Sequence, residues 1–141
     1  MKHHPSQISP VGWYIASYIE RLDSVEAFER EDPNHVPFGV WKNRILVKAH
    51  TPEEALERTW CHLADVGCDF TNVEGLNCRS AVVGITGLIP IYDPLEDGEE
   101  IEWIDCTGET VGEMMKKIRD PKQLEAFTIP ASAGEDPDAG A

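Results

Sequence analysis

Two stretches of the chain alternate between hydrophobic and polar positions, which is the pattern of a β-strand with one buried face. The first, "GWYIASYIERL" at residues 12–22, is rich in the aromatic and β-branched side chains that favour strands. The second, "VWKNRILVKAH" at residues 40–50, alternates in the same way and carries three basic side chains. Between them, residues 23–39 are acidic and broken by prolines, which predicts a long loop with one helical turn near residues 25–30.

A helix that begins after Thr51 is the best-marked element of the chain. The sequence "TPEE" offers Thr51 as the N-cap, a proline at the first helical position and Glu54 at the capping-box position. Apolar residues then recur at helical spacing until the glycine at position 67, which is a natural helix stop: Leu56, Trp60 and Leu63.

A shorter helix is predicted nearer the C-terminus by a second Thr-x-x-Glu pair, Thr110 and Glu113. It would stop before the following proline and place Met114, Met115 and Ile118 inward.

Further strands are predicted between these two helices. "CDFTNVEGLNC" reads as a short strand with a turn at Glu74–Gly75, and the apolar run "SAVVGITGLIPIYD" at residues 80–93 reads as a longer one. Two glycines in that run suggest a strand that bends or lies close to another backbone. The turn signal Asp97–Gly98 precedes "IEWIDC" at residues 101–106, which alternates like another strand.

The order of these elements predicts an α+β fold: an antiparallel sheet of four to five strands with one long and one short helix packed on one face. The chain has 141 residues, enough for one domain, which we place at 12–129. Residues 1–11 are predicted to be a flexible lead-in and residues 130–141 a disordered acidic tail. The tryptophans, one per main element, are expected to share the core rather than line a ligand groove: Trp13, Trp41, Trp60 and Trp103.

The net charge of −14 changes the picture of what the protein can bind. Nucleic-acid backbones and anionic membrane surfaces would repel it, so neither is an expected partner, whereas basic proteins and cations would be attracted. A merely solubilising surface is the alternative. The N-terminus lacks the apolar segment of a signal peptide and no stretch is long enough for a membrane helix, so we expect a cytoplasmic protein with reduced thiols.

The cysteines form no recognisable metal or redox motif. Cys61 and His62 are adjacent on the predicted helix and therefore point about 100° apart, while Cys68 lies beyond its end. No Cys-x-x-Cys pair is present, so we expect structural thiols, with a metal site assembled in three dimensions or a reactive thiol as the alternatives. Whether Cys61, Cys68 and Cys78 come together in space is left open by the sequence.

Candidates for acid–base chemistry are three histidines, His35, His50 and His62, but none is spaced with a nucleophile. No nucleophile elbow or glycine-rich phosphate loop is present. We therefore predict no catalytic residue, no metal ligand and no cofactor; whether the protein is an enzyme stays open, with a non-enzymatic role favoured.

The densest acidic stretch, residues 93–113, contains nine carboxylates and no basic residue. It does not fit a calcium-binding EF-hand loop, because apolar residues and a proline occupy ligand positions. The stretch can be a solvated face, a cation site or a surface for a basic partner. For the last of these, the predicted contact residues are Glu96, Asp97, Glu99, Glu100 and Glu102.

Three blocks of sequence carry a family resemblance. The strand "WYIA" at residues 13–16 is the first, and "WKNRILVKAHTPEEA" at residues 41–55 is the second, one residue shorter than the family pattern. The third comprises Asn72, Gly75, Gly84, Ile85, Leu88, Asp93, Leu95, Asp97, Gly98, Glu100 and Ile101. In this order they resemble the small bacterial family catalogued as domain of unknown function 4288, over about residues 12–106. The resemblance implies a fold but no chemistry, because the family is uncharacterised.

Charge and size together favour a non-enzymatic protein-binding module, such as an immunity- or antitoxin-like inhibitor or adaptor of a basic partner. The alternative is a small-molecule- or metal-binding domain with a pocket between sheet and helix. A third hypothesis is a homo-oligomer, which an exposed edge strand at residues 82–89 would encourage.

Overall fold

The structure, a computed structural model, describes residues 3–128. The chain divides into two compact units, Met1–Trp103 and Ile104–Ala141. The first unit contains, in chain order, the 3-10 turn η1 (Pro5–Gln7), β1 (Trp13–Ser24), α1 (Val25–Arg30), β2 (Gly39–Lys48), α2 (Pro52–Leu63), β3 (Gly67–Thr71) and β4 (Asn77–Pro90). The described part of the second unit contains α3 (Val111–Lys116) and two 3-10 turns, η2 (Pro121–Gln123) and η3 (Glu125–Phe127).

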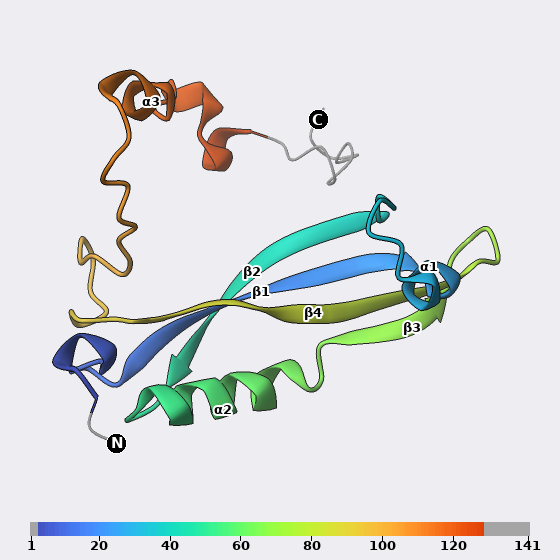
Figure 1. The fold of residues 1–141 in the computed structure, drawn as a ribbon, viewed down its shortest axis with the longest axis horizontal. Coiled ribbons are helices and arrows are strands. Elements are labelled where there is room, and N and C mark those ends of the chain that lie inside the picture. Colours follow the sequence, from blue (N-terminus) through green and yellow to red (C-terminus); the bar gives the residue numbers. More distant parts are fainter. Residues whose placement is uncertain (1–2, 129–141) are drawn as a thin grey trace, which may run out of the picture. The chain divides into compact units, whose positions relative to one another are not determined.

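The four strands form one antiparallel sheet in the order β2-β1-β4-β3 (Figure 1). β1 lies inside the sheet, pairing with β2 from Trp13↔Lys48 to Leu22↔Gly39 and with β4 along its other side. Its β-branched and aromatic side chains suit a strand that is paired on both sides. The predicted α+β class is confirmed, with a sheet of four strands.

α2 lies against one face of the sheet (Figure 1). The helix begins where predicted, since the Thr51 side chain caps it by accepting a hydrogen bond from the Glu54 amide at 3.1 Å. The core is formed by one alternating row of β1, the paired row of β2 and the inner side of α2. These residues are Tyr14, Ala16, Val47, Ala49 and Ala55, with Ile45 and Leu88 packed against them.

The two sides of β4 are paired to different extents. β1 pairs with it from Pro90 to Cys78, whereas β3 pairs only with residues 77–81. The stretch from Val82 to Pro90 therefore has no strand partner on its outer side among the described residues. Two register shifts against β1 fall in the same stretch, and the residues they leave unpaired with β1, Val83 and Thr86, are exposed.

Ser9 joins the N-terminal segment to the sheet. Its amide donates to the Tyr14 hydroxyl at 3.1 Å, and its own hydroxyl donates to the Ile91 carbonyl and accepts from the Trp13 amide. Ser9 is buried, so these three hydrogen bonds satisfy polar groups that water cannot reach.

The strand predicted at residues 101–106 is absent. The turn at Asp97–Gly98 forms, with Gly98 at φ +86°, but the residues after it have no regular secondary structure. Alternation only shows that an extended segment would be amphipathic, whereas a strand also needs a neighbour with free backbone groups. None of the described strands pairs with this segment.

Several apolar residues that were predicted to lie in the core are exposed. Trp13 is half-buried, but Trp41, Trp60 and Trp103 are exposed, Trp103 by 60%. Met114 and Met115 of α3 and Ile118 just beyond it, all predicted to point inward, are more than half exposed. The core of the first unit is filled mainly by alanine, valine and tyrosine side chains, so it has little room for indole rings.

The described part of the second unit is held by local contacts. The Thr110 hydroxyl caps α3 by accepting from the Glu113 amide at 3.1 Å, and Lys117 contacts Glu109 and the Cys106 sulfur. The tail predicted at 130–141 lies outside the described residues. No described helix is long and apolar enough to cross a membrane.

Candidate functional site

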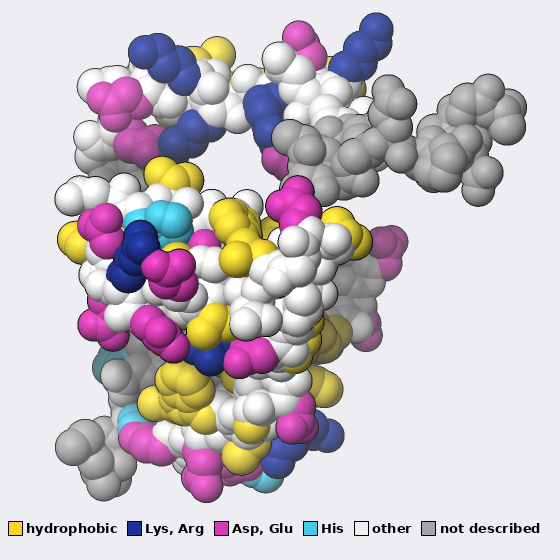
Figure 2. Space-filling model, turned by 90° about the vertical axis from the view of Figure 1, so that its right-hand side faces the viewer, with side chains coloured by type: hydrophobic (Ala, Val, Ile, Leu, Met, Phe, Trp, Pro, Cys, Tyr) yellow, Lys and Arg dark blue, Asp and Glu magenta, His cyan; other side chains and the backbone are white. Residues whose placement is uncertain are grey.

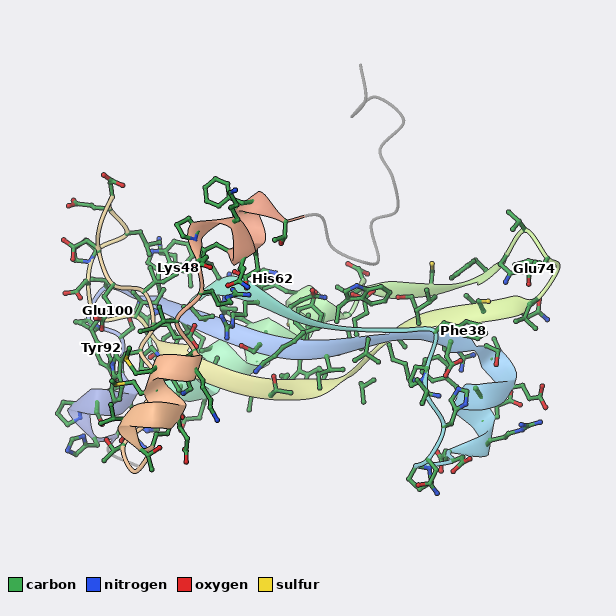
Figure 3. All side chains as sticks on the ribbon, turned by 90° about the horizontal axis from the view of Figure 1, so that it is seen from above. Phe38, Lys48, His62, Glu74, Tyr92 and Glu100 are labelled. Carbon is green, nitrogen blue, oxygen red and sulfur yellow. The ribbon has the colours of Figure 1, made fainter. Side chains whose placement is uncertain are left out.

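The predicted partner-binding carboxylates lie on one loop, Asp93–Trp103, which we name the acidic loop. It follows β4 and belongs to the first unit. Figure 3 places Glu100 at the same end of the sheet as Tyr92 and Lys48, opposite the end that carries Phe38 and Glu74. The five predicted residues are close together because they lie within seven consecutive positions of this loop.

These five carboxylates do not have equal surroundings. Glu96, Asp97, Glu99 and Glu100 are exposed, and no ion pair involving them is found among the described residues. The side chain of Glu102 is only 15% exposed and lies 3.2 Å from the Arg44 guanidinium on β2. Glu102 thus attaches the loop to the sheet, while the other four remain available to a partner.

The acidic loop also exposes apolar side chains, two of which, Ile101 and Trp103, belong to the predicted strand at 101–106. Leu95 is 43% exposed, Ile101 53% and Trp103 60%. A turn in the loop is closed by the Glu99 amide, which donates to the Glu96 carbonyl at 3.1 Å, and Gly98 supplies the positive φ that it needs. Tryptophan is enriched at protein interfaces and among the residues that contribute most to binding energy.

A buried carboxylate, Asp23, lies at the end of β1 and was not anticipated. Its side chain is completely buried and is contacted by Arg21 at 2.6 Å, His35 Nε2 at 2.8 Å and the Ser24 amide at 2.9 Å. Burial alone raises the pKa of Asp23, but the hydrogen bonds from Arg21, Ser24 and His35 outweigh it and hold this pKa below its ordinary value. An available signal was the Arg-x-Asp spacing, which puts both side chains on one strand face.

Asp23 and its partners join β1 to α1 and to the loop before β2. The Arg21 guanidinium stacks on the Phe28 ring of α1 at 4.3 Å, so the same arginine joins the carboxylate to the helix. His35 brings the loop before β2 to the same point and borders a hollow of about 110 Å³. The Ser24 hydroxyl at this hollow accepts from the Ala27 amide as a helix cap, so it is engaged in structure rather than poised as a nucleophile.

The other histidines and the cysteines do not assemble into a site. His50 pairs with Glu54 at 3.5 Å and is almost fully exposed, and His62 is exposed on α2. The cysteines are free; Cys78 is buried and the other three are exposed. Within residues 3–128 no group of three or more His, Cys, Asp or Glu side chains could hold a metal ion.

A larger cleft of about 510 Å³ opens between the N-terminal segment, the start of α2 and the sheet. Tyr14, Leu88 and Pro90 contribute apolar surface, and the polar groups come from the rim. There His3 Nε2 lies 2.7 Å from a Glu53 carboxylate oxygen. A smaller hollow of about 170 Å³ lies between the end of β2 and α2 and is lined by Lys48, His50, Glu54 and Arg58.

Comparison with known families shows which protein family the chain belongs to. Residues 13–103 match the family described as a domain of unknown function, DUF4288. The chain belongs to the DUF4288 family. The matched region ends where the first compact unit ends, so the DUF4288 domain contains the sheet, α1, α2 and the acidic loop. No curated protein and no solved structure matches the chain.

Proposed function

We propose that this DUF4288 protein is a non-enzymatic, cytoplasmic protein-binding module whose acidic loop engages a basic partner, as an inhibitor or adaptor does. The observation that carries the proposal is the composition of the exposed surface of the loop. Four exposed carboxylates, which form no ion pair within residues 3–128, share the loop with exposed leucine, isoleucine and tryptophan side chains. A loop that served only to keep the protein soluble would have no need to expose Trp103.

The two kinds of side chain would act at different stages of binding. The net charge of −14 and the carboxylates of the loop attract a cationic protein over a distance and raise the rate of encounter. Apolar contact with Leu95, Ile101 and Trp103 would then slow dissociation, because burying an aromatic side chain is a common source of interface affinity. The Arg44–Glu102 ion pair would limit the entropy lost when the loop is ordered by a partner.

A reducing compartment is supported by three exposed free thiols, Cys61, Cys68 and Cys106, none of which is in a disulfide.

The test compares three full-length variants in a pull-down from native lysate, followed by reconstitution with the purified partner. The first neutralises the loop, Glu96→Gln, Asp97→Asn, Glu99→Gln and Glu100→Gln. The second is Trp103→Ala. The third is a matched control that removes the same charge from exposed positions elsewhere: Glu57→Gln, Asp65→Asn, Glu74→Gln and Glu113→Gln.

We expect the neutralised loop to slow association by about 10-fold or more and to remove most of its dependence on salt. Trp103→Ala should instead accelerate dissociation, while the control should keep the wild-type affinity. The proposal is wrong if the control loses as much binding as the loop variant, or if no basic protein is retained at low salt.

A second candidate function is small-molecule binding in the 510 Å³ cleft, which the combination of an apolar floor and the His3–Glu53 pair favours. The test is a metabolite screen by thermal shift and native mass spectrometry on the wild type and Leu88→Trp, which would fill the cleft. A ligand that stabilises the wild type but not the filled variant would support this candidate, and equal stabilisation of both would reject it.

A further inference from the structure

The outer side of β4 between Val82 and Pro90 is an edge that the sheet leaves open. β3 ends its pairing at the level of Ala81, and none of the described strands continues alongside. Val83 is 62% exposed and the remaining residues of the stretch are half-buried, apart from exposed Thr86. An apolar edge of this length is a known template for pairing with another chain.

The sheet's other edge, β2, differs from this one in charge. β2 carries Lys42, Arg44 and Lys48, and charged side chains are a common means of preventing strand-to-strand association. Residues 80–92 contain no charged side chain at all, although the whole chain carries a net charge of −14. Two copies can therefore bring this stretch together without opposing like charges, whereas two copies of β2 cannot.

α2 presents an apolar flank beside the same edge. Its Glu54 and Arg58 line a hollow with Lys48 of β2, while Pro52 and Glu53 line the 510 Å³ cleft with Leu88 and Pro90 of β4. Residues 53, 56 and 60 are three and four positions apart, so they share the flank that is turned toward β4.

Leu56 and Trp60 on this flank are 43% and 49% exposed. Figure 2 views the α1 end of Figure 1, a different side from this flank, and shows hydrophobic side chains between acidic ones there. We name the apolar residues of the open β4 edge and of this flank the β4 edge surface: Leu56, Trp60 and residues 82–90. Glu53, on the same flank, is the charged residue at its border.

We propose that a second copy of this chain binds to the β4 edge surface and forms a two-fold symmetric dimer. In such a dimer the same patch is used by both copies, so the patch must be complementary to itself in charge and shape. Antiparallel pairing of the two β4 edges would extend the sheet across the dimer. The Leu56–Trp60 flanks of both α2 helices would meet on one face of it.

The two irregularities of β4 shape this contact. They bend the strand at Val83 and Thr86, so backbone pairing between copies would extend over short runs, and side-chain packing would supply the remaining contact. The dimer surface differs from the acidic loop, and the two proposals can fail independently because different variants remove them.

The experiment measures the mass of the full-length protein by sedimentation equilibrium between about 1 and 500 μM, a range that detects micromolar to submillimolar association. The test variant is Val83→Lys with Thr86→Lys, at positions exposed enough for the fold to tolerate lysine. The matched control places two lysines on the opposite edge, Val40→Lys with Leu46→Lys, where the side chains are 53% and 50% exposed. Circular dichroism checks that both fold.

We expect the wild type to dimerise, the β4 variant to associate about 100-fold more weakly or not at all, and the β2 control to dimerise like the wild type. Trp60→Ala should weaken the dimer to a smaller extent. A wild type that stays monomeric throughout this concentration range overturns the proposal. So does a dimer that survives the β4 lysines, or one that the β2 lysines disrupt equally.

Discussion

At the scale of single residues, Asp23 shows how one buried charge can be made compatible with a small core. A carboxylate removed from water is costly unless cations and hydrogen-bond donors surround it. Arg21, His35 and the Ser24 amide fill that role, and Arg21 and His35 bring α1 and the loop before β2 to the same point. The cluster therefore fixes the end of the sheet away from the acidic loop.

Replacing Asp23 tests how much this cluster contributes to stability. Asp23→Ala should lower the free energy of unfolding by about 2–3 kcal/mol, because Arg21 and His35 lose their partner in a buried setting. The matched control is Asp69→Ala, which removes an Asp–Arg pair of the same chemistry that is exposed on β3 and β4. Urea unfolding should show a much smaller change for the control, and equal losses would contradict this account.

The pH dependence of stability follows from the same carboxylate. Its pKa in the folded protein lies below the ordinary value of 3.8, so its stabilising effect is complete above that value and is lost as the pH falls through the lower folded pKa. The wild type should therefore lose stability on acidification more steeply than Asp23→Asn, which cannot titrate. Urea unfolding between pH 2 and 5 measures the difference, and parallel curves for the two proteins would argue against the cluster.

At the scale of secondary-structure elements, the connection from α2 into β3 depends on the backbone at Gly67. This residue has φ +97°, and a Cβ atom there would lie 2.2 Å from the Ser80 carbonyl oxygen of the adjacent strand. The sequence marked this glycine as a helix stop, but its strictest requirement comes from close approach to β4.

Gly67→Ala should therefore lower the free energy of unfolding by about 3 kcal/mol or more, since both the left-handed backbone and the contact oppose a side chain. Gly98→Ala is the control, because its φ is +86° with open space around the added atom. At position 98 only the left-handed backbone opposes alanine, which should lower the free energy of unfolding by about 1–2 kcal/mol. Chemical denaturation separates the two, and a similar cost at both positions would exclude the steric explanation.

The N-caps of α2 and α3 allow a second comparison between elements. Both threonines accept a hydrogen bond from the amide three residues later, each at 3.1 Å. Thr51→Ala should cost about 1 kcal/mol in global stability because α2 contributes buried residues to the core. Thr110→Ala should leave the main unfolding transition unchanged, since α3 has no buried residue; an equal shift for both would refute this distinction.

At the scale of the whole molecule, the division at Trp103 coincides with the end of the DUF4288 match. The first unit contains the complete sheet, its covering helix and the ion pair that holds the acidic loop. A unit with its own core can in principle fold alone.

A chain truncated after Trp103 should therefore keep a cooperative unfolding transition, with a free energy within about 0.5 kcal/mol of the full-length value. Urea titration followed by tryptophan fluorescence measures it, since all four tryptophans lie in the retained part. A fragment that fails to unfold cooperatively would show that the sheet needs the residues after 103.

The sequence by itself determined those features that depend on local chemistry. The alternation at 12–22, the cap at Thr51, the helical turn at 25–30 and the turn at Gly75 reappear in the structure close to their predicted positions. Each follows from side-chain periodicity or from the backbone preference of one residue. The family blocks likewise led to the correct family, because they lie in these elements and their turns.

Only the tertiary structure decided which amphipathic segments find partners. Residues 101–106 alternate as convincingly as β2, yet the strand order leaves them unpaired and puts Trp103 at the surface. The tertiary structure also decided that Asp23 is buried. Its three partners come from β1, the junction of β1 with α1, and a distant loop. Partner choice depends on contacts between residues far apart in the chain, and local pattern carries no information about which of them will form.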